Sequence, residues 1–124
     1  MAITQVVVQT PANQTIFTDS VMGGTVDAVK ASSCLAFYLF ADNSANGVPA
    51  YVKLFNLAQG SVVLGTTAPD EIVYVPANAK ITHIFFTGAV IGKTFSTALS
   101  AAAVTTGGTS GTSGSSIPVI ISYV

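Results

Sequence analysis

The side chains that most often carry enzyme chemistry are few in this sequence and lie far apart. His83 is the single histidine and Cys34 the single cysteine. A catalytic histidine needs a nucleophile and an orienting acid nearby, and a metal site needs further ligands. His83 stands between Thr82 and Ile84 in an apolar run, which favours a structural role. Cys34 opens an apolar run with no charge beside it, which is typical of a buried, inert thiol and leaves no partner for a disulfide.

The acidic side chains offer one arrangement that could bind a cation. Asp70 and Glu71 are adjacent, so on a strand they would point to opposite faces and would not form a carboxylate pair. Asp42, Asn43 and Asn46 stand in the segment DNSANGV, where their oxygens could coordinate Ca²⁺. The same residue types are favoured in turns without any metal. We therefore expect no metal ion and no cofactor, and no enzyme activity.

The one glycine-rich stretch is GGTSGTSGSS, residues 107–116. It lacks the lysine that a phosphate-binding loop needs, and no strand-to-helix transition follows it. Its composition is typical of a flexible loop between two strands.

Two segments predict contacts between subunits. Residues 1–10 contain a run of valines, which indicates a strand or an extended arm, and the glycine-rich loop is the other candidate. The residues that we expect at such contacts are Val6, Val7, Val8, Gly107, Gly108, Thr109 and Ser110.

Composition excludes several classes of partner. Of 124 residues, 7% are charged and 50% hydrophobic, the formal net charge is −1, and the mean hydropathy is +0.66. Nucleic-acid binding needs a basic patch, and four basic side chains do not supply one. The longest apolar run has seven residues (35–41), whereas a membrane-spanning helix needs about 20, and the N-terminus does not resemble a signal peptide. Because the N-terminus lacks a signal-peptide pattern, we expect the protein to be made in a cytoplasm. So little charge predicts that it packs against other subunits.

The elements that must position these residues are strands. Short runs of β-favouring residues recur between Gly, Pro, Asn and Ser clusters, and no helical stripe lasts three turns. The expected strands are 3–9, 15–19, 25–30, 34–41, 50–57, 72–75, 79–87, 95–105 and 117–124. This pattern predicts a single all-β domain over residues 11–124, an antiparallel β-sandwich of jelly-roll type with about eight or nine short strands.

Alternation within the strands predicts the core. Val52 and Leu54 share one apolar face of the 50–57 strand, and we expect them in the core together with Ile84 and Phe86. The opposite face of the 50–57 strand carries Tyr51, Lys53 and Phe55, so that face meets another surface or is half in water. The segment 42–48 contains Asn-Gly and predicts a turn that pairs strand 34–41 with strand 50–57.

Several segments resemble small virion proteins of tailed bacteriophages. These are VKASSCLAFYLFADN, AYVKLFNLA, APDEIVYVPANAKITHIFF and FSTALSAAA, with the matching motifs at residues 51–56, 75–77 and 95–100. Ala98 stands where that pattern commonly has glycine. The resemblance spans roughly Lys30 to the end. It implies a β-sandwich in a virion, as a capsid decoration or cement protein without an enzymatic site, on the capsid surface and in contact with the major capsid protein or other virion subunits.

Two functions from different classes remain open. The first is the structural virion subunit, for which we expect a homo-oligomer, a trimer first. The second is a carbohydrate- or receptor-binding β-sandwich of a phage tail or fibre, for which Tyr38, Tyr51 and Tyr74 are candidate groove residues.

Overall fold

The structure is a computed structural model that describes residues 13–124, so the expected strand 3–9 and Val6, Val7 and Val8 lie outside the described residues. The described part contains eleven strands and one short 3₁₀ turn, η1 (Gln59–Ser61), and all strand pairs are antiparallel. The all-β prediction is therefore confirmed. No helix in this part is long and apolar enough to cross a membrane.

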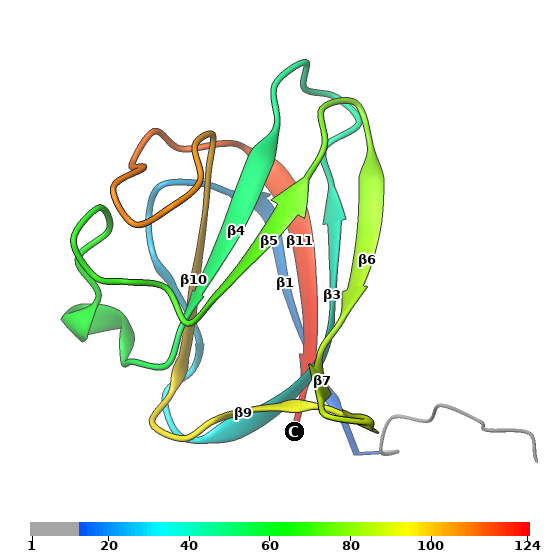
Figure 1. The fold of residues 1–124 in the computed structure, drawn as a ribbon, viewed down its shortest axis with the longest axis vertical. Coiled ribbons are helices and arrows are strands. Elements are labelled where there is room, and N and C mark those ends of the chain that lie inside the picture. The colour runs from blue at the N-terminus through cyan, green and yellow to red at the C-terminus, as the bar shows by residue number, and fades with distance from the viewer. Residues whose placement is uncertain (1–12) are drawn as a thin grey trace, which may run out of the picture.

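Nine of the strands form two sheets, one of five strands and one of four (Figure 1). The first sheet has the order β1 (Thr15–Met22), β11 (Ile117–Tyr123), β3 (Cys34–Asp42) and β6 (Lys80–Ile84), and β9 (Lys93–Phe95) also pairs with β3. The second sheet has the order β2 (Asp27–Lys30), β10 (Leu99–Val104), β4 (Ala50–Phe55) and β5 (Glu71–Val75). A separate hairpin joins β7 (Phe86–Thr87) and β8 (Val90–Ile91).

The hydrophobic core draws on both sheets. Leu39 and Ile121 from the first sheet share one buried cluster with Val52, Leu54 and Leu99 from the second. Each strand alternates its side chains between its two faces, so the faces that carry these residues point towards each other. The prediction that Val52 and Leu54 are buried is confirmed, because both have no exposed surface.

The prediction for Ile84 and Phe86 is wrong. They are 41% and 53% exposed, whereas Phe85 between them is 2% exposed and belongs to the core. On β6 the inward-facing positions are Ile81 and His83, and Phe85 continues that alternation. Apolar residues occupy both parities of this segment, so alternation alone does not say which parity points inward.

The predicted pairing of 34–41 with 50–57 is also wrong. β3 pairs with β11, β6 and β9, whereas β4 pairs with β10 and β5. The connection between β3 and β4 therefore crosses from one sheet to the other instead of forming a hairpin. The expected strand 95–105 likewise divides into the end of β9 and the whole of β10, which lie in different sheets.

Four connections meet at one end of the two sheets, drawn at the top of Figure 1. They are β1–β2 (23–26), β3–β4 (43–49), β5–β6 (76–79) and β10–β11 (105–116). Backbone hydrogen bonds hold them in place: the N–H of Asn78 donates to the carbonyl of Asn46 at 2.9 Å, and the N–H of Ala103 on β10 donates to the carbonyl of Gly23 at 2.9 Å. This end of the molecule is the place where segments far apart in sequence can form a site.

Candidate functional site

The glycine-rich loop 105–116 lies against the second sheet and is held there by Lys53. The Lys53 side chain has no exposed surface, and its Nζ donates to the carbonyl oxygens of Gly111 at 2.9 Å and Thr109 at 3.4 Å. Burial lowers the pKa of the Lys53 ammonium. The sequence left open whether this face of β4 meets another surface or is half in water. Lys53 and Phe55 are buried, so the face meets another surface at both residues. For Lys53 that surface is the chain's own loop.

Backbone contacts complete the attachment of this loop. The N–H of Thr105 donates to Ser113 at 2.8 Å, and the N–H of Ser115 donates to Ala103 at 3.0 Å. A Cβ on Gly111 would lie 2.5 Å from the carbonyl oxygen of Thr106, so this position admits no side chain. The loop is therefore not the free connection that its composition predicts.

The predicted contact residues of the loop lie at the surface. Gly107, Gly108, Thr109 and Ser110 are all exposed. Gly108 has φ +75°, a conformation that favours glycine. Their role in a contact between subunits stays a prediction.

Two of the three tyrosines suggested for ligand binding lie together beside this loop. The rings of Tyr51 and Tyr74 are 5.3 Å apart and tilted by 50°, and Tyr74 is 51% exposed. Tyr51 also meets the loop, since a Cβ on Gly107 would lie 3.0 Å from its ring. Tyr38 does not join them, because it lies on the outer face of the first sheet. One groove lined by all three tyrosines is therefore not formed.

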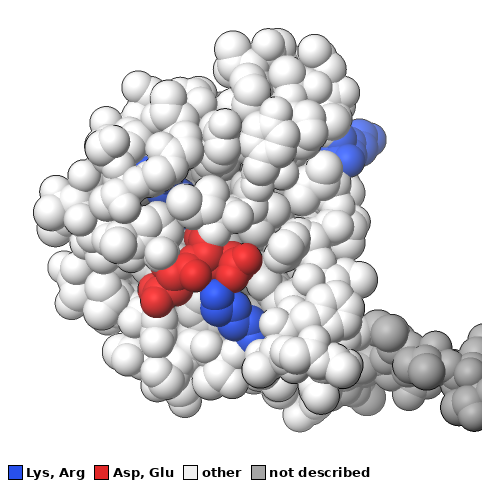
Figure 2. All heavy atoms as spheres, in the orientation of Figure 1, with Lys and Arg blue, Asp and Glu red and all other residues white. Residues whose placement is uncertain are grey.

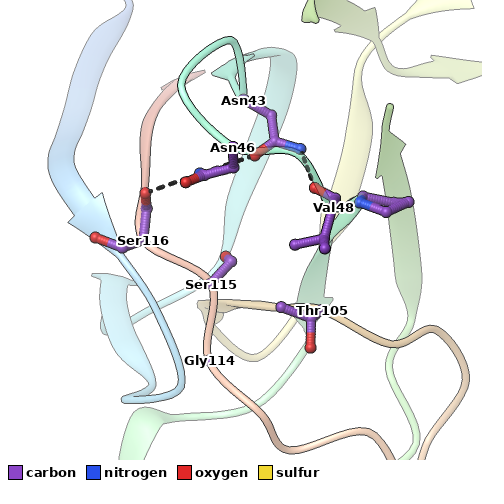
Figure 3. A pocket seen from close by; sticks show the side chains of 8 residues that line it. Asn43, Asn46, Val48, Thr105, Gly114, Ser115 and Ser116 are labelled. Atoms are coloured by element: carbon purple, nitrogen blue, oxygen red, sulfur yellow. Dashed lines mark hydrogen bonds between the residues drawn. The ribbon is translucent and has the colours of Figure 1, made fainter. Parts of the chain in front are cut away.

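A small cavity opens where the β3–β4 and β10–β11 connections meet (Figure 3). Its volume is about 200 Å³. Its walls carry no charged side chain, and the hydroxyl oxygen of Ser115 is buried there without a hydrogen-bond partner in the described part of the chain. The lining residues are Asn43, Asn46, Val48, Pro49, Thr105, Gly114, Ser115 and Ser116.

Asn43 ties together the connections beside this cavity. Its side chain is 1% exposed, and its Nδ2 donates to the carbonyls of Val48 at 2.8 Å and Pro76 at 3.1 Å, which ties two connections together. Its Oδ1 accepts from Nδ2 of Asn46 at 2.9 Å. Asp42 Oδ1 accepts from the hydroxyl and from the backbone N–H of Ser44, and these two bonds lower the pKa of Asp42. Of the three side-chain oxygens suggested for Ca²⁺, those of Asp42 and Asn43 accept hydrogen bonds within the turn.

His83 belongs to a group of three side chains, with Glu71 at its centre and Lys93 as the third member. Among the described residues, no other salt bridges link three side chains. Glu71 Oε2 is 2.5 Å from Lys93 Nζ, and Glu71 Oε1 is 3.8 Å from His83 Nε2. The His83 ring also packs edge-on against Phe85, with centroids 4.9 Å apart. Figure 2 shows acidic and basic side chains gathered in the middle of one face that is otherwise almost uncharged. Because Glu71 and His83 stand on β5 and β6, the edge strands of the two sheets, this group closes the edge between them.

A carboxyl pair closes the opposite edge. Asp19 stands on β1 and Asp27 on β2, the other two edge strands. Burial, and then the neighbouring Asp19 carboxyl, raise the pKa of Asp27 to about 7, and the interaction with Asp27 holds the pKa of Asp19 below its usual value.

The remaining chemical candidate, the Cys34 thiol, does not have the surroundings of a reactive group. Cys34 is 6% exposed, and burial raises the pKa of its thiol, so the predicted buried thiol is confirmed. Among residues 13–124, no three His, Cys, Asp or Glu side chains are grouped so that they could hold a metal ion. Sequence reasoning missed Lys53 and Asn43 as the residues that build this end. The available signal for Lys53 was a single cation between the large side chains of Tyr51 and Phe55 on a strand.

Comparison with known proteins gave no match: no family model matches the chain, and no curated protein or solved structure matches it significantly.

Proposed function

We propose that this chain is a non-enzymatic structural protein of a tailed-phage virion, which decorates or cements the capsid by bridging shell subunits, and that its two sheets form a jelly-roll-like β-sandwich. The major capsid protein or another virion subunit is its partner on the capsid surface, and a homotrimer is the first oligomer to test. The proposal starts from the resemblance of residues 30–124 to small virion proteins.

The observation that carries the proposal is the pairing of the eight principal strands. In chain order, the first pairs with the eighth (β1 with β11), the second with the seventh (β2 with β10), the third with the sixth (β3 with β6) and the fourth with the fifth (β4 with β5). This nested pairing is that of one long hairpin wrapped into two layers. Double-sheet folds of this kind are frequent in viral capsid and lectin domains.

Charge supports an assembly role. With 7% charged residues, contacts between subunits would depend on apolar burial and on backbone or hydroxyl hydrogen bonds. Few ion pairs are then available for salt to screen, so raising the ionic strength should weaken the assembly only slightly.

The test is physical association with particles. Purified virions of the phage that encodes the chain should contain it by mass spectrometry, and images of particles with and without it should differ by density on the outside of the capsid. Its absence from purified virions would refute the proposal. A stable monomer in light scattering, at concentrations where it still decorates particles, would refute the oligomer alone.

The second candidate is a carbohydrate- or receptor-binding module of a phage tail or fibre. It is favoured by the Tyr51–Tyr74 pair, whose half-exposed ring lies beside the hydroxyl-rich loop, because aromatic rings with a few polar groups are typical of ligand sites. A glycan array separates the two: binding that Tyr74→Ala abolishes supports the second function, and an array without signal supports the first.

A further inference from the structure

Asn46 links three of the four connections that meet at the end of the molecule drawn at the top of Figure 1. Its Nδ2 donates to Oδ1 of Asn43 at 2.9 Å and to the carbonyl of Ser116 at 3.3 Å (Figure 3). Its own carbonyl accepts from the N–H of Asn78 at 2.9 Å. The β3–β4, β5–β6 and β10–β11 connections therefore depend on this one residue for part of their attachment.

The residue after Asn46 is Gly47, and this is the one Asn-Gly step in the sequence. Gly47 is exposed, and a Cβ built on it would meet no atom within 4 Å. Among the hydrogen bonds of residues 13–124, none has the Gly47 N–H as its donor. Because no bond holds this nitrogen and no side chain shields it, it is free to approach the Asn46 side chain.

Asn43, three residues earlier in the same turn, is arranged differently. Its side chain is 1% exposed, and its Nδ2 donates to the carbonyls of Val48 and Pro76. The N–H that follows it, that of Ser44, already donates to Asp42 Oδ1 at 3.0 Å. Both the side-chain amide of Asn43 and the peptide nitrogen after it are therefore engaged, which makes Asn43 an internal control for Asn46.

An asparagine amide next to a free peptide nitrogen can deamidate without an enzyme, which is one reason why asparagine is a thermolabile residue. The Gly47 nitrogen attacks Cγ of Asn46, so the N–Cγ bond forms and the Cγ–Nδ2 bond breaks. Ammonia leaves with the proton of the Gly47 N–H, and a succinimide ring remains. Water, the one co-reactant, then opens the ring at either carbonyl and gives aspartate or isoaspartate.

We propose that Asn46–Gly47 is a self-modification site of the folded protein, and that deamidation of Asn46 releases the β10–β11 connection from the β3–β4 connection. The product carboxylate has no N–H to donate, so both bonds of Nδ2 are lost. Its negative oxygens stand beside Oδ1 of Asn43 and the carbonyl of Ser116, which are both acceptors. The cavity between the two connections also gains a charge, whereas none of its eight lining residues is charged before the change. The inference does not depend on the virion function.

The experiment ages the purified full chain in warm, mildly alkaline buffer and locates deamidation by tandem mass spectrometry. Fragment ions separate Asn46 from Asn43, and in the folded chain the mass gain should accumulate at Asn46 and not at Asn43. The same chain in urea gives the rate without the fold. The folded chain should react no more than about tenfold more slowly, which corresponds to about 1.4 kcal/mol of added barrier for turning the amide away from its two acceptors.

Gly47→Ala is the matched control, because the added methyl group meets no atom within 4 Å but shields the attacking nitrogen. This variant should fold like the parent by circular dichroism and should lose the mass gain at Asn46 over the same period. If it is unfolded, Gly47→Ser provides a second side chain at the same position.

Hydrogen exchange measures the release of the connection. In the aged protein the amide of Ser115, which donates to the carbonyl of Ala103 and precedes Ser116, should exchange faster than in the fresh protein, whereas amides within β3 should not. Asn46→Asp carries the carboxylate from the start and should show the same increase without ageing.

Each outcome decides the proposal. Deamidation of Asn46 in urea but not in the folded chain overturns it, because the fold then protects the amide. An equal gain in the parent and in Gly47→Ala also overturns it, because the Gly47 nitrogen is then not the nucleophile. Deamidation without faster exchange at Ser115 overturns the release of the connection. A gain at Asn46 that Gly47→Ala abolishes, together with faster exchange at Ser115, supports the proposal.

Discussion

Replacing Lys53 with methionine should release the glycine-rich loop and destabilise the fold. Methionine keeps an unbranched apolar side chain at this fully buried position but removes the ammonium that donates to Gly111 and Thr109. Thr109 is exposed, so its carbonyl can bind water instead. Gly111 is buried, so its carbonyl loses its partner.

The expected loss follows from three contributions. A hydrogen bond from a charged donor contributes about 1.5–3 kcal/mol, and a buried carbonyl left without a partner costs about 1–3 kcal/mol. Removing the buried charge offsets part of this loss of stability, because the variant has no ammonium whose burial costs free energy. We therefore expect Lys53→Met to lower the free energy of unfolding by about 1–3 kcal/mol. Lys80→Met, at a side chain that is 61% exposed, should change it by less than about 0.5 kcal/mol.

Urea unfolding of both variants measures the difference, and hydrogen exchange locates it. In Lys53→Met the amides of Thr105 and Ser115, whose N–H groups hold the ends of the loop, should exchange faster, whereas amides within β3 and β11 should change only as much as global stability does. If Lys53→Met is as stable as Lys80→Met and these two amides keep their protection, Lys53 does not hold the loop.

Four further predictions concern charge, packing, backbone space and metal binding. Asp27 has a folded pKa of about 7 against 3.8 when unfolded, so the stability that Asp27 contributes should be fully present below about pH 4 and be lost as the pH rises through about 7. Asp27→Asn should remove this loss, which solvent screening reduces to on the order of 1–3 kcal/mol, and thermal melts at pH 4 and pH 8 that move equally in both proteins would contradict it. Leu54→Ala should cost about 2–5 kcal/mol in urea unfolding because Leu54 is fully buried in the core; a cost below about 1 kcal/mol would mean that the site collapses around the smaller side chain. Gly111→Ala should destabilise the loop, because its Cβ would lie 2.5 Å from the Thr106 carbonyl oxygen, whereas Gly47→Ala, which meets no atom within 4 Å, should unfold like the parent. A chelator should leave the melting temperature unchanged, and a fall of many degrees would reveal a metal site.

Local sequence was sufficient where one strand face is apolar and the other is not. Val52 and Leu54 share such a face, and both are buried. Most strand positions were also predictable, because Gly, Pro and Asn clusters end strands through backbone conformation, which depends on neighbouring residues only. The resulting all-β class is what the structure has.

Strand partners were decided by tertiary structure. β3 and β4 are consecutive and joined through Asn-Gly, yet they do not form a hairpin and each pairs within its own sheet. The buried amide of Asn43 bonds to Val48 in their connection and to Pro76 at the end of β5. The choice between Phe85 and its two apolar neighbours was equally open in the sequence. Phe85 is the residue that is buried, because Ile81 and His83 on β6 point inwards and Phe85 continues their alternation.

The environment of a polar residue depends on segments far away in the sequence. Lys53 stands 58 residues before Gly111, and nothing within its own strand indicates that a loop would supply its hydrogen-bond acceptors. The sequence by itself determined which residues form strands and that few charges are available for contacts, because these follow from residue type and local spacing. Only the tertiary structure decided that Lys53 is buried and that the glycine-rich loop is attached, because each depends on which surface another part of the chain covers.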